Sequence, residues 1–186
     1  MSVTTTRTVL LPAGTWDIDP SHSSVEFTVR HLMVSKVKGR FTGFSGTVTV
    51  PENPLESVVR ASVDVTSVHT GDPQRDAHLR TADFFEAEKH PTMDFVSTAI
   101  RPAGDGYVLA GRLGLHGITR DVELDLEFNG WGPGMDGSPR AGFTATGEIN
   151  RRDYGITIDM PLANGGAVVG DRVKLALEIE LAQAAD

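Results

Sequence analysis

Apolar and polar side chains alternate with a period of two along most of this 186-residue chain. Segment 121–128 shows the pattern most clearly, because four apolar residues there alternate with four acidic ones. The same pattern, weaker in places, recurs in segments 25–29, 36–50, 59–65, 92–101, 107–115, 141–149 and 173–181. Successive side chains of a strand point to opposite faces of a sheet, so each segment predicts a half-buried β-strand.

Short glycine-containing turns separate several of these segments. They are Gly104–Gly106, His116–Gly117 and the stretch 130–137. Such residues tolerate the positive φ angles of hairpin turns. Sequential strands joined by short turns form a meander, and a meander without helices at its ends tends to close on itself. The sequence therefore predicts an all-β fold, an antiparallel barrel of about eight strands.

Residues 72–89 break the alternation. A helix is expected over 74–82, and Asp83 is expected to cap a second short helix over 84–89 that ends before Pro91. This segment lies between the fourth and fifth strands, where it would form a short helical flap. Residues 1–14 are rich in Thr and are expected to form a flexible N-terminal arm, which leaves 15–186 as a single domain.

Composition and charge exclude several classes of function. The chain has no cysteine, so disulfides, thiolate nucleophiles and cysteine-ligated metals are absent. The net charge of −8, without a cluster of more than two Lys or Arg, argues against a nucleic-acid partner. No segment approaches the roughly 18 apolar residues of a membrane span, so no stable membrane insertion is expected. The first residues lack the apolar stretch of a secretory signal, and the expected location is the cytoplasm.

The histidines do not show the spacing of metal ligands. No two of them fit an HExxH motif or a His-x-His pair, so neither a metal site nor a cofactor is expected. The six are His22, His31, His69, His78, His90 and His116. His31 continues the apolar face of Val25, Phe27 and Val29, which places its ring at one end of the barrel interior. There it could contact a polar end group of a ligand or be a hydrogen-bonded core histidine.

A dense polar cluster, Arg75, Asp76, His78 and Arg80, lies in the expected flap. No GxSxG motif and no pair of inward carboxylates accompanies it, so it fits neither a hydrolase nor a glycosidase. We expect Arg75, Asp76 and Asp83 to anchor the flap through ion pairs and helix caps. No catalytic residue is assigned.

Isolated glycines interrupt two of the strand segments. Such glycines usually mark bulges or corners where a barrel curls. None lies in a GxGxxG or P-loop frame, so nucleotide binding is not expected. The residues are Gly39, Gly43, Gly46, Gly111 and Gly114.

Blocks of sequence from Trp16 to Leu181 occur in an order that resembles one known family. They are Trp16–Asp19, His22–Leu32, Gly39–Phe41, Val63–Thr70, Arg75–Leu79, Asp83–Pro91, Phe95–Thr98, Gly111–Thr119, Ile149–Arg151, Asp153–Gly155 and Gly170–Asp171. Together they resemble the YceI-like family of polyisoprenoid-binding, lipocalin-like β-barrel proteins. The resemblance covers nearly the whole chain.

The resemblance implies an extended eight-stranded antiparallel barrel with a long apolar pore. It implies guests that are isoprenoid chains, quinone-like lipids or fatty-acid derivatives, and no catalytic residues. Members of the family are often dimeric, so a homodimer is an expected assembly. Many relatives are exported to the periplasm, whereas this chain shows no signal, which leaves the ligand and an envelope role open.

The inward faces of the strands supply the candidate ligand-binding residues. An eight-stranded barrel can be wide enough to hold one ligand. Each of these residues could equally pack in a dry core, and the sequence leaves both alternatives open. The candidates, with His31 at one end, are Phe27, Val29, Phe95, Leu109, Leu113, Leu124, Leu126, Phe143, Leu175 and Leu177.

Three classes of function remain after this reading. The favoured one is a protein that binds and carries or stores an apolar small molecule in the barrel interior. The alternative is an enzyme that acts on an apolar substrate in the same cavity, with His31 as its acid or base. The third is an interaction protein with a dry barrel. In the first class, His31→Phe is expected to lower ligand affinity by about 0.5–3 kcal/mol.

Overall fold

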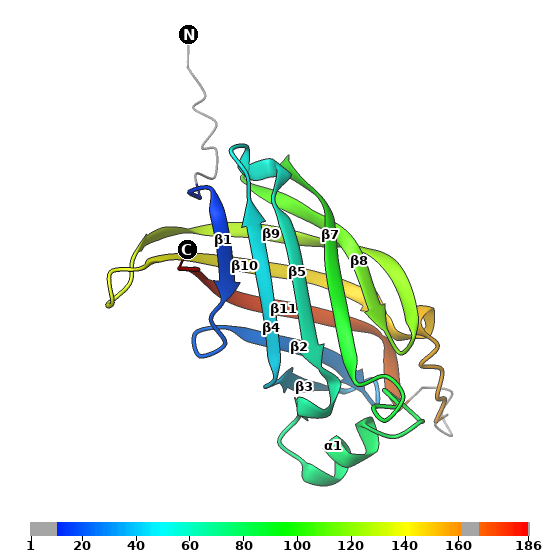
Figure 1. Ribbon diagram of the computed structural model, residues 1–186. Helices are drawn as coiled ribbons and strands as arrows, with labels where there is room; N and C mark the ends of the chain where they lie inside the picture. Colours follow the sequence, from blue (N-terminus) through cyan, green and yellow to red (C-terminus); the bar gives the residue numbers. More distant parts are fainter. Residues whose placement is uncertain (1–10, 161–167, 186) are drawn as a thin grey trace.

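Antiparallel strands make up most of the computed structural model, which describes residues 11–160 and 168–185 (Figure 1). They form a single eleven-stranded sheet. The strands are β1 (Gly14–Ile18), β2 (Ser24–His31), β3 (Ser35–Phe41), β4 (Phe44–Val50), β5 (Val58–Asp64), β6 (Val68–His69), β7 (Thr92–Ala103), β8 (Gly106–Leu115), β9 (Ile118–Pro133), β10 (Pro139–Asn150) and β11 (Val169–Gln183). One α-helix, α1 (Pro73–Leu79), and three 3-10 helices, η1 (Pro54–Glu56), η2 (Val65–Ser67) and η3 (Arg151–Tyr154), complete the described elements.

Three positions in the barrel wall are each filled by two strands. β1 and β2 both pair with the same edge of β11 and share the first position. In the second position, β4 pairs with β1 and β3 pairs with β2. In the third position, β5 pairs with β4 and β6 pairs with β3. Strands β7 to β11 fill the remaining positions in sequence order. The pairing of β1 with β11 closes the sheet. The predicted eight-stranded antiparallel barrel is therefore confirmed.

Two of the three breaks within these positions meet at one corner of the wall. Gly43 lies between β3 and β4, and η2 lies between β5 and β6. The amide of Gly43 donates to Ser67 Oγ (2.9 Å), and the amide of Asp64 donates to the carbonyl of Gly43 (2.8 Å). These bonds satisfy backbone groups where the strand ladder is interrupted. The corner predicted from Gly43 is present.

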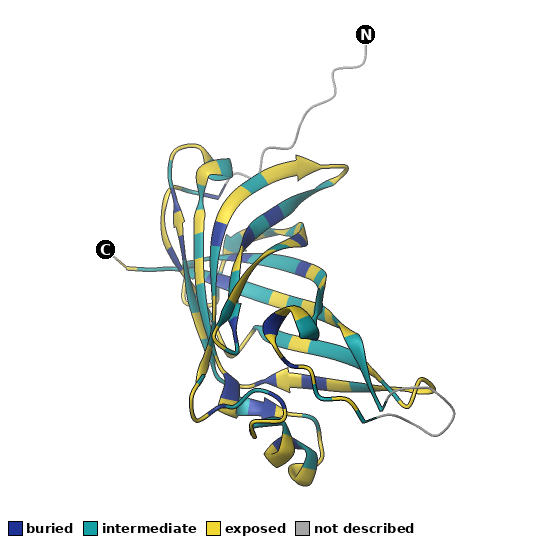
Figure 2. Cartoon of the chain, turned by 90° about the vertical axis from the view of Figure 1, so that its right-hand side faces the viewer, coloured by how far each residue is buried: buried dark blue, intermediate teal, exposed yellow. Residues whose placement is uncertain are grey.

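Residues of the strands alternate between exposed and more buried positions, as Figure 2 shows along the wall. The inward side chains form three clusters along the barrel. One surrounds Trp16, which is fully buried, and a second lies midway around Leu109, Leu124 and Ala145. The third lies at the flap end around Phe84, Leu115 and Tyr154. This burial is the main source of stability for such a sheet.

The flap contains one short helix, α1, rather than two. Asp72 caps α1 by accepting hydrogen bonds from the amides of Gln74 and Arg75, so the helix begins and ends earlier than 74–82. The predicted helix over 84–89 is wrong, because the chain turns back on α1. The amide of Phe85 donates to the carbonyl of Leu79 (3.0 Å), and Glu86 has a positive φ of 48°. Asp83 caps no helix, and its carboxylate lies 2.8 Å from His78 Nε2.

Polar contacts, some of them part-buried, fasten the flap to the end of the barrel, below β3 and β5 in Figure 1. Asp76 is 5% exposed and accepts hydrogen bonds from the amide and the hydroxyl of Thr70 (2.8 and 2.5 Å). Arg75 donates to the hydroxyl and carbonyl of Thr70, and Arg80 donates to the carbonyl of Thr66 (2.8 Å). Arg75 and Asp76 therefore anchor the flap as expected, but through hydrogen bonds with Thr70 rather than helix caps, and Asp83 contacts His78 within the flap.

The predicted arm, 1–14, falls mostly on residues outside the described ranges, but Leu11 packs in the Trp16 cluster and Gly14 begins β1. Within residues 11–160 and 168–185, no helix has the length and apolarity needed to cross a membrane.

Candidate functional site

A continuous apolar cavity of about 310 Å³ occupies the barrel interior. A volume of this size is at the lower end of the range of small-molecule pockets. Inward side chains of strands on all sides line it. Ten of the eleven residues predicted to bind ligand are among them: Phe27, Val29, Phe95, Leu109, Leu113, Leu124, Leu126, Phe143, Leu175 and Leu177. Their contact with a ligand stays a prediction.

His31 is the exception, because it is not among the residues that line the cavity. It is the last residue of β2, opposite Ser35 on β3 and Val169 on β11. Beyond it Leu32 and Met33 adopt positive φ angles and the chain reverses. A register shift in β11 between Val169 and Val173 also interrupts the ladder at this point. The period-two extrapolation from Val29 to His31 therefore does not reach the cavity.

Residues outside the regular strands line the two ends of the cavity. Pro54 and Leu55 of η1 line one end, and Leu79, Phe84 and Phe85 of the flap line the other. Phe85 also packs edge-on against Phe41 at 5.9 Å between ring centroids. The sequence pattern did not assign these five residues to the site, because turns and flaps carry no period-two signal. Their apolar character within otherwise polar turns was the available signal.

The charged side chain of Arg151 reaches this mostly apolar lining, but its charge is already matched. Arg151 is 5% exposed and donates to the carbonyls of Ile156 (2.8 Å) and Gly170 (3.1 Å). Its Nη2 also lies 3.0 Å from the carboxylate of Asp171. These partners compensate the buried charge and link the end of β10 to the start of β11.

Two glycines in the strands provide room for aromatic rings, and one of them also marks a bulge as expected, because the register of β7 and β8 shifts opposite Gly111. A Cβ at Gly39 would lie 2.3 Å from Cζ of Phe27, its direct partner on β2. A Cβ at Gly111 would lie 2.4 Å from Cζ of Phe95. Any larger residue would push these rings away from the wall and into the interior. Gly39 and Gly111 therefore help to keep the cavity open.

Clusters of histidine and carboxylate occur in the fold despite the absence of ligand spacing in the sequence. Glu86, His90 and His116 lie together at the flap end, and Asp19, His22 and Glu180 lie together elsewhere on the wall. Each cluster combines residues from separate segments of the chain. A spacing rule cannot detect such sites, because it compares only residues close in sequence.

Comparison with known proteins agrees with the barrel fold. The chain is 39% identical over 145 residues to Protein YceI of Escherichia coli, covering 77% of this chain and 76% of that protein. BcnA of Burkholderia cenocepacia has a similar structure, with a TM-score of 0.75, 22% identity and coverage of 88% and 98%. A polyisoprenoid-binding domain from Saccharophagus degradans superposes with a TM-score of 0.67 at 16% identity, covering 91% and 98%.

A family model described as the YceI-like domain matches residues 16–181. The match starts at the fully buried Trp16 and ends at Leu181 on β11, whose partner across the closing pair is Ile18. It therefore spans the whole closed barrel, including the flap and both ends of the cavity. The chain belongs to the YceI-like domain family.

Proposed function

We propose that this protein binds one elongated apolar small molecule in the barrel interior and carries or stores it. The observation that supports this most is the continuous apolar cavity, lined from η1 at one end to Phe84 and Phe85 at the other. A dry core of this size would instead fill its interior to close packing. The open interior and the glycines that hold two aromatic rings against the wall fit a protein with a guest.

The energetics of such binding need few polar contacts. Burial of each CH₂ group contributes about 0.8 kcal/mol, so several isoprene units or a fatty-acyl chain can bind tightly in an apolar lining. The best match among guest classes is therefore a flexible isoprenoid, quinone-like lipid or fatty-acid derivative. The structural neighbour from Saccharophagus degradans is described as polyisoprenoid-binding, which agrees with this class.

The enzyme alternative, with His31 as its acid or base, has no support from the cavity, because His31 is not part of the lining. Arg151 is held by carbonyl and carboxylate partners. We therefore propose a binding protein rather than an enzyme.

The proposal is tested by what the purified protein contains and takes up. Organic extraction followed by mass spectrometry should release an apolar molecule, and a fluorescent polyene fatty acid should bind the emptied protein at one site. If the extract holds no apolar molecule and the emptied protein takes up neither this probe nor a polyprenol, the interior is a dry core and the proposal fails.

A matched pair of variants tests whether the binding site lies within the barrel. Ala145 lines the cavity, whereas its neighbour Thr146 on β10 is exposed. Ala145→Phe should displace at least two CH₂ groups of a guest and weaken probe binding ~10-fold or more. Thr146→Phe adds the same ring outside and should leave binding unchanged. Equal effects of both variants would contradict an interior site.

A further inference from the structure

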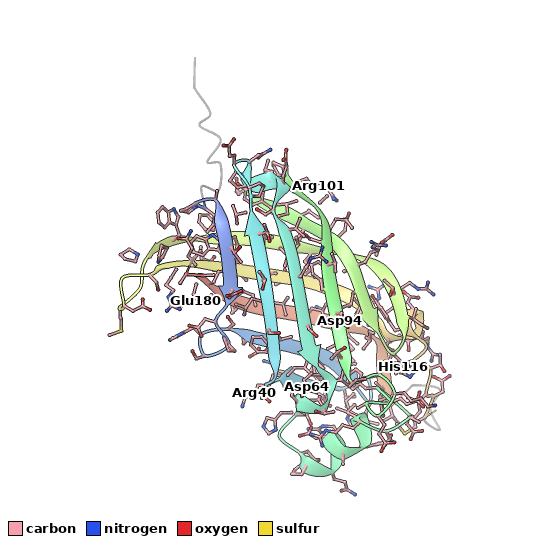
Figure 3. The ribbon with its side chains drawn as sticks, in the orientation of Figure 1. Arg40, Asp64, Asp94, Arg101, His116 and Glu180 are labelled. Carbon is pink, nitrogen blue, oxygen red and sulfur yellow. The ribbon has the colours of Figure 1, made fainter. Side chains whose placement is uncertain are left out.

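Three potential metal-ligand side chains meet where the flap touches the β8–β9 turn. Glu86 comes from the turn after α1, and His90 precedes β7. His116, which is labelled in Figure 3, lies in the β8–β9 turn. Glu86 Oε2 lies 3.7 Å from His116 Nε2 and 4.0 Å from His90 Nε2. Ligand atoms of the three residues lie within 4.8 Å of one another, and the two imidazole centroids are 5.2 Å apart.

The hydrogen bonding of His116 leaves one ring nitrogen facing this group. Its Nδ1 lies 2.9 Å from the carbonyl oxygen of Tyr154. A carbonyl can only accept, so Nδ1 carries a proton and donates. Nε2 is buried and has no hydrogen-bond partner among the described residues. A buried polar atom without a partner is costly.

The same arrangement is typical of histidines that bind metals. A metal-ligating imidazole usually donates its other N–H to a carbonyl or carboxylate, which fixes the tautomer and directs the lone pair at the ion. His116 meets this condition through Tyr154. Gly117 then allows His90 to lie against the turn, because a Cβ at Gly117 would be 2.7 Å from Cε1 of His90.

The second cluster, Asp19, His22 and Glu180, differs because a positively charged side chain already lies beside its carboxylates. Arg140 Nη1 lies 2.9 Å from Asp19 Oδ2 and 3.7 Å from Glu180 Oε1, so a guanidinium occupies the space between the carboxylates. His22 there is also largely exposed. In the flap cluster Lys89 binds only Oε1 of Glu86 (2.6 Å), and Oε2 is left facing the two imidazoles.

We propose that Glu86, His90 and His116 bind one divalent transition-metal ion, with Zn²⁺ the best fit. Two imidazole nitrogens and one carboxylate oxygen form a common zinc donor set, with water in the fourth position. Tetrahedral bonds of about 2.1 Å place ligand atoms roughly 3.4 Å apart, so small side-chain rotations would bring these atoms to bonding distance.

The ion would fasten the turn after α1 to the β8–β9 turn. Phe84 and Phe85, next to Glu86, line the flap end of the cavity, so the ion would hold this end in place. This proposal does not depend on the identity of the guest or on its presence.

The test uses the full chain without a histidine tag, stripped of metal by a chelator. Calorimetric titration with Zn²⁺ should show one equivalent per chain, and Co²⁺ should give the visible absorption of a tetrahedral site. Glu86→Gln and His90→Gln should each weaken binding ~10-fold or more. His116→Asn removes an imidazole ligand and should also weaken binding ~10-fold or more. Asn is chosen because it tolerates the positive φ of 54° at this position. His22→Gln, in the other cluster, is the control and should bind as the wild type does.

Thermal melting separates loss of metal binding from loss of fold. The metal-free variants should melt close to the metal-free wild type, whereas Zn²⁺ should raise the melting temperature of the wild type and of His22→Gln alone. No binding by the wild type would overturn the proposal. Weak binding that all variants share would mean an adventitious ion only. Fatty-acid uptake by the metal-free protein, measured in parallel, keeps this outcome separate from the binding function.

Discussion

The wall of the barrel and its flap end are built by different kinds of contact. In the wall, each residue's direction follows from its parity along a strand, as in β9, where Leu124 is buried and Asp125 is exposed. At the flap end, irregular segments meet through specific polar contacts, such as Asp76 with Thr70, six residues apart, and Arg80 with Thr66, fourteen residues apart. Strand periodicity therefore determines the cavity, and individual polar contacts determine how its flap end is closed.

The difference between the two regions predicts different sensitivities to mutation. The wall depends on apolar burial, which tolerates apolar exchange but not an unpaired charge. The flap depends on a few hydrogen bonds to ionised groups, each of which contributes more than a neutral one. A charge placed in the wall should therefore have a larger effect than any single change in the flap.

The largest effect is expected from Leu124→Asp in the wall. Leu124 is 6% exposed between Leu109 and Ala145, so a carboxylate there would be buried without a partner. We expect a loss of about 4 kcal/mol or more in the free energy of unfolding, or failure to fold. Urea unfolding followed by circular dichroism measures it.

The control for this variant is Thr146→Asp, which adds the same charge on the outer surface of β10. Thr146 is exposed and lies opposite Asp125, so only weak repulsion is expected, about 0.5 kcal/mol. Similar losses in the two variants would mean that the wall does not separate an apolar interior from solvent.

An intermediate effect is expected from Asp76→Asn in the flap. The change removes the charge that accepts two hydrogen bonds from Thr70 and should cost about 2 kcal/mol at pH 7. Asp83→Asn is its control, because the Asp83–His78 pair is exposed and contributes about 0.5 kcal/mol. If Asp83→Asn costs as much as Asp76→Asn, burial does not distinguish the flap contacts.

The same pair of variants predicts the acid dependence of stability. Burial raises the pKa of Asp76, but the hydrogen bonds from Thr70 and the charges of His69 and Arg80 outweigh it, so the pKa lies below its usual value. Its stabilisation is therefore complete above the unfolded value of about 3.9 and is lost as pH falls through the lower folded value. The stability difference between wild type and Asp76→Asn should shrink in acid, which unfolding curves from pH 7 to pH 2 would show.

The wall could be predicted from the sequence because its signal is local. Ten inward residues were placed correctly from period two, since a strand fixes the direction of each side chain. The roles of Gly39 and Gly111 could not be predicted in this way. Their function depends on a ring carried by a neighbouring strand, and the register of that strand is not written in the segment itself.

The flap end could be predicted only in outline. The anchoring of Asp76 was expected, but the absence of a second helix follows from bonds between Phe85 and Leu79 that fold the chain back on α1. The meeting of Glu86 with His90 and His116 likewise depends on the pairing of β7 with β8, which brings the β8–β9 turn beside the residues that precede β7. Periodicity does not encode contacts of this kind.

The smallest effect is expected from His31→Phe, and it tests where the regular wall ends. The alternation of Phe27 and Val29 predicts that the ring of His31 points into the barrel, in which case the variant should lose about 0.5–3 kcal/mol in ligand affinity. The structure places His31 outside the lining, so we expect probe binding to change less than about 2-fold. Val29→Thr, two residues earlier, keeps the side-chain shape but puts a hydroxyl in the cavity, and should weaken binding of the same fluorescent fatty acid several-fold. A larger loss in His31→Phe than in Val29→Thr would show that the period continues to the end of β2 and that a guest reaches beyond the cavity.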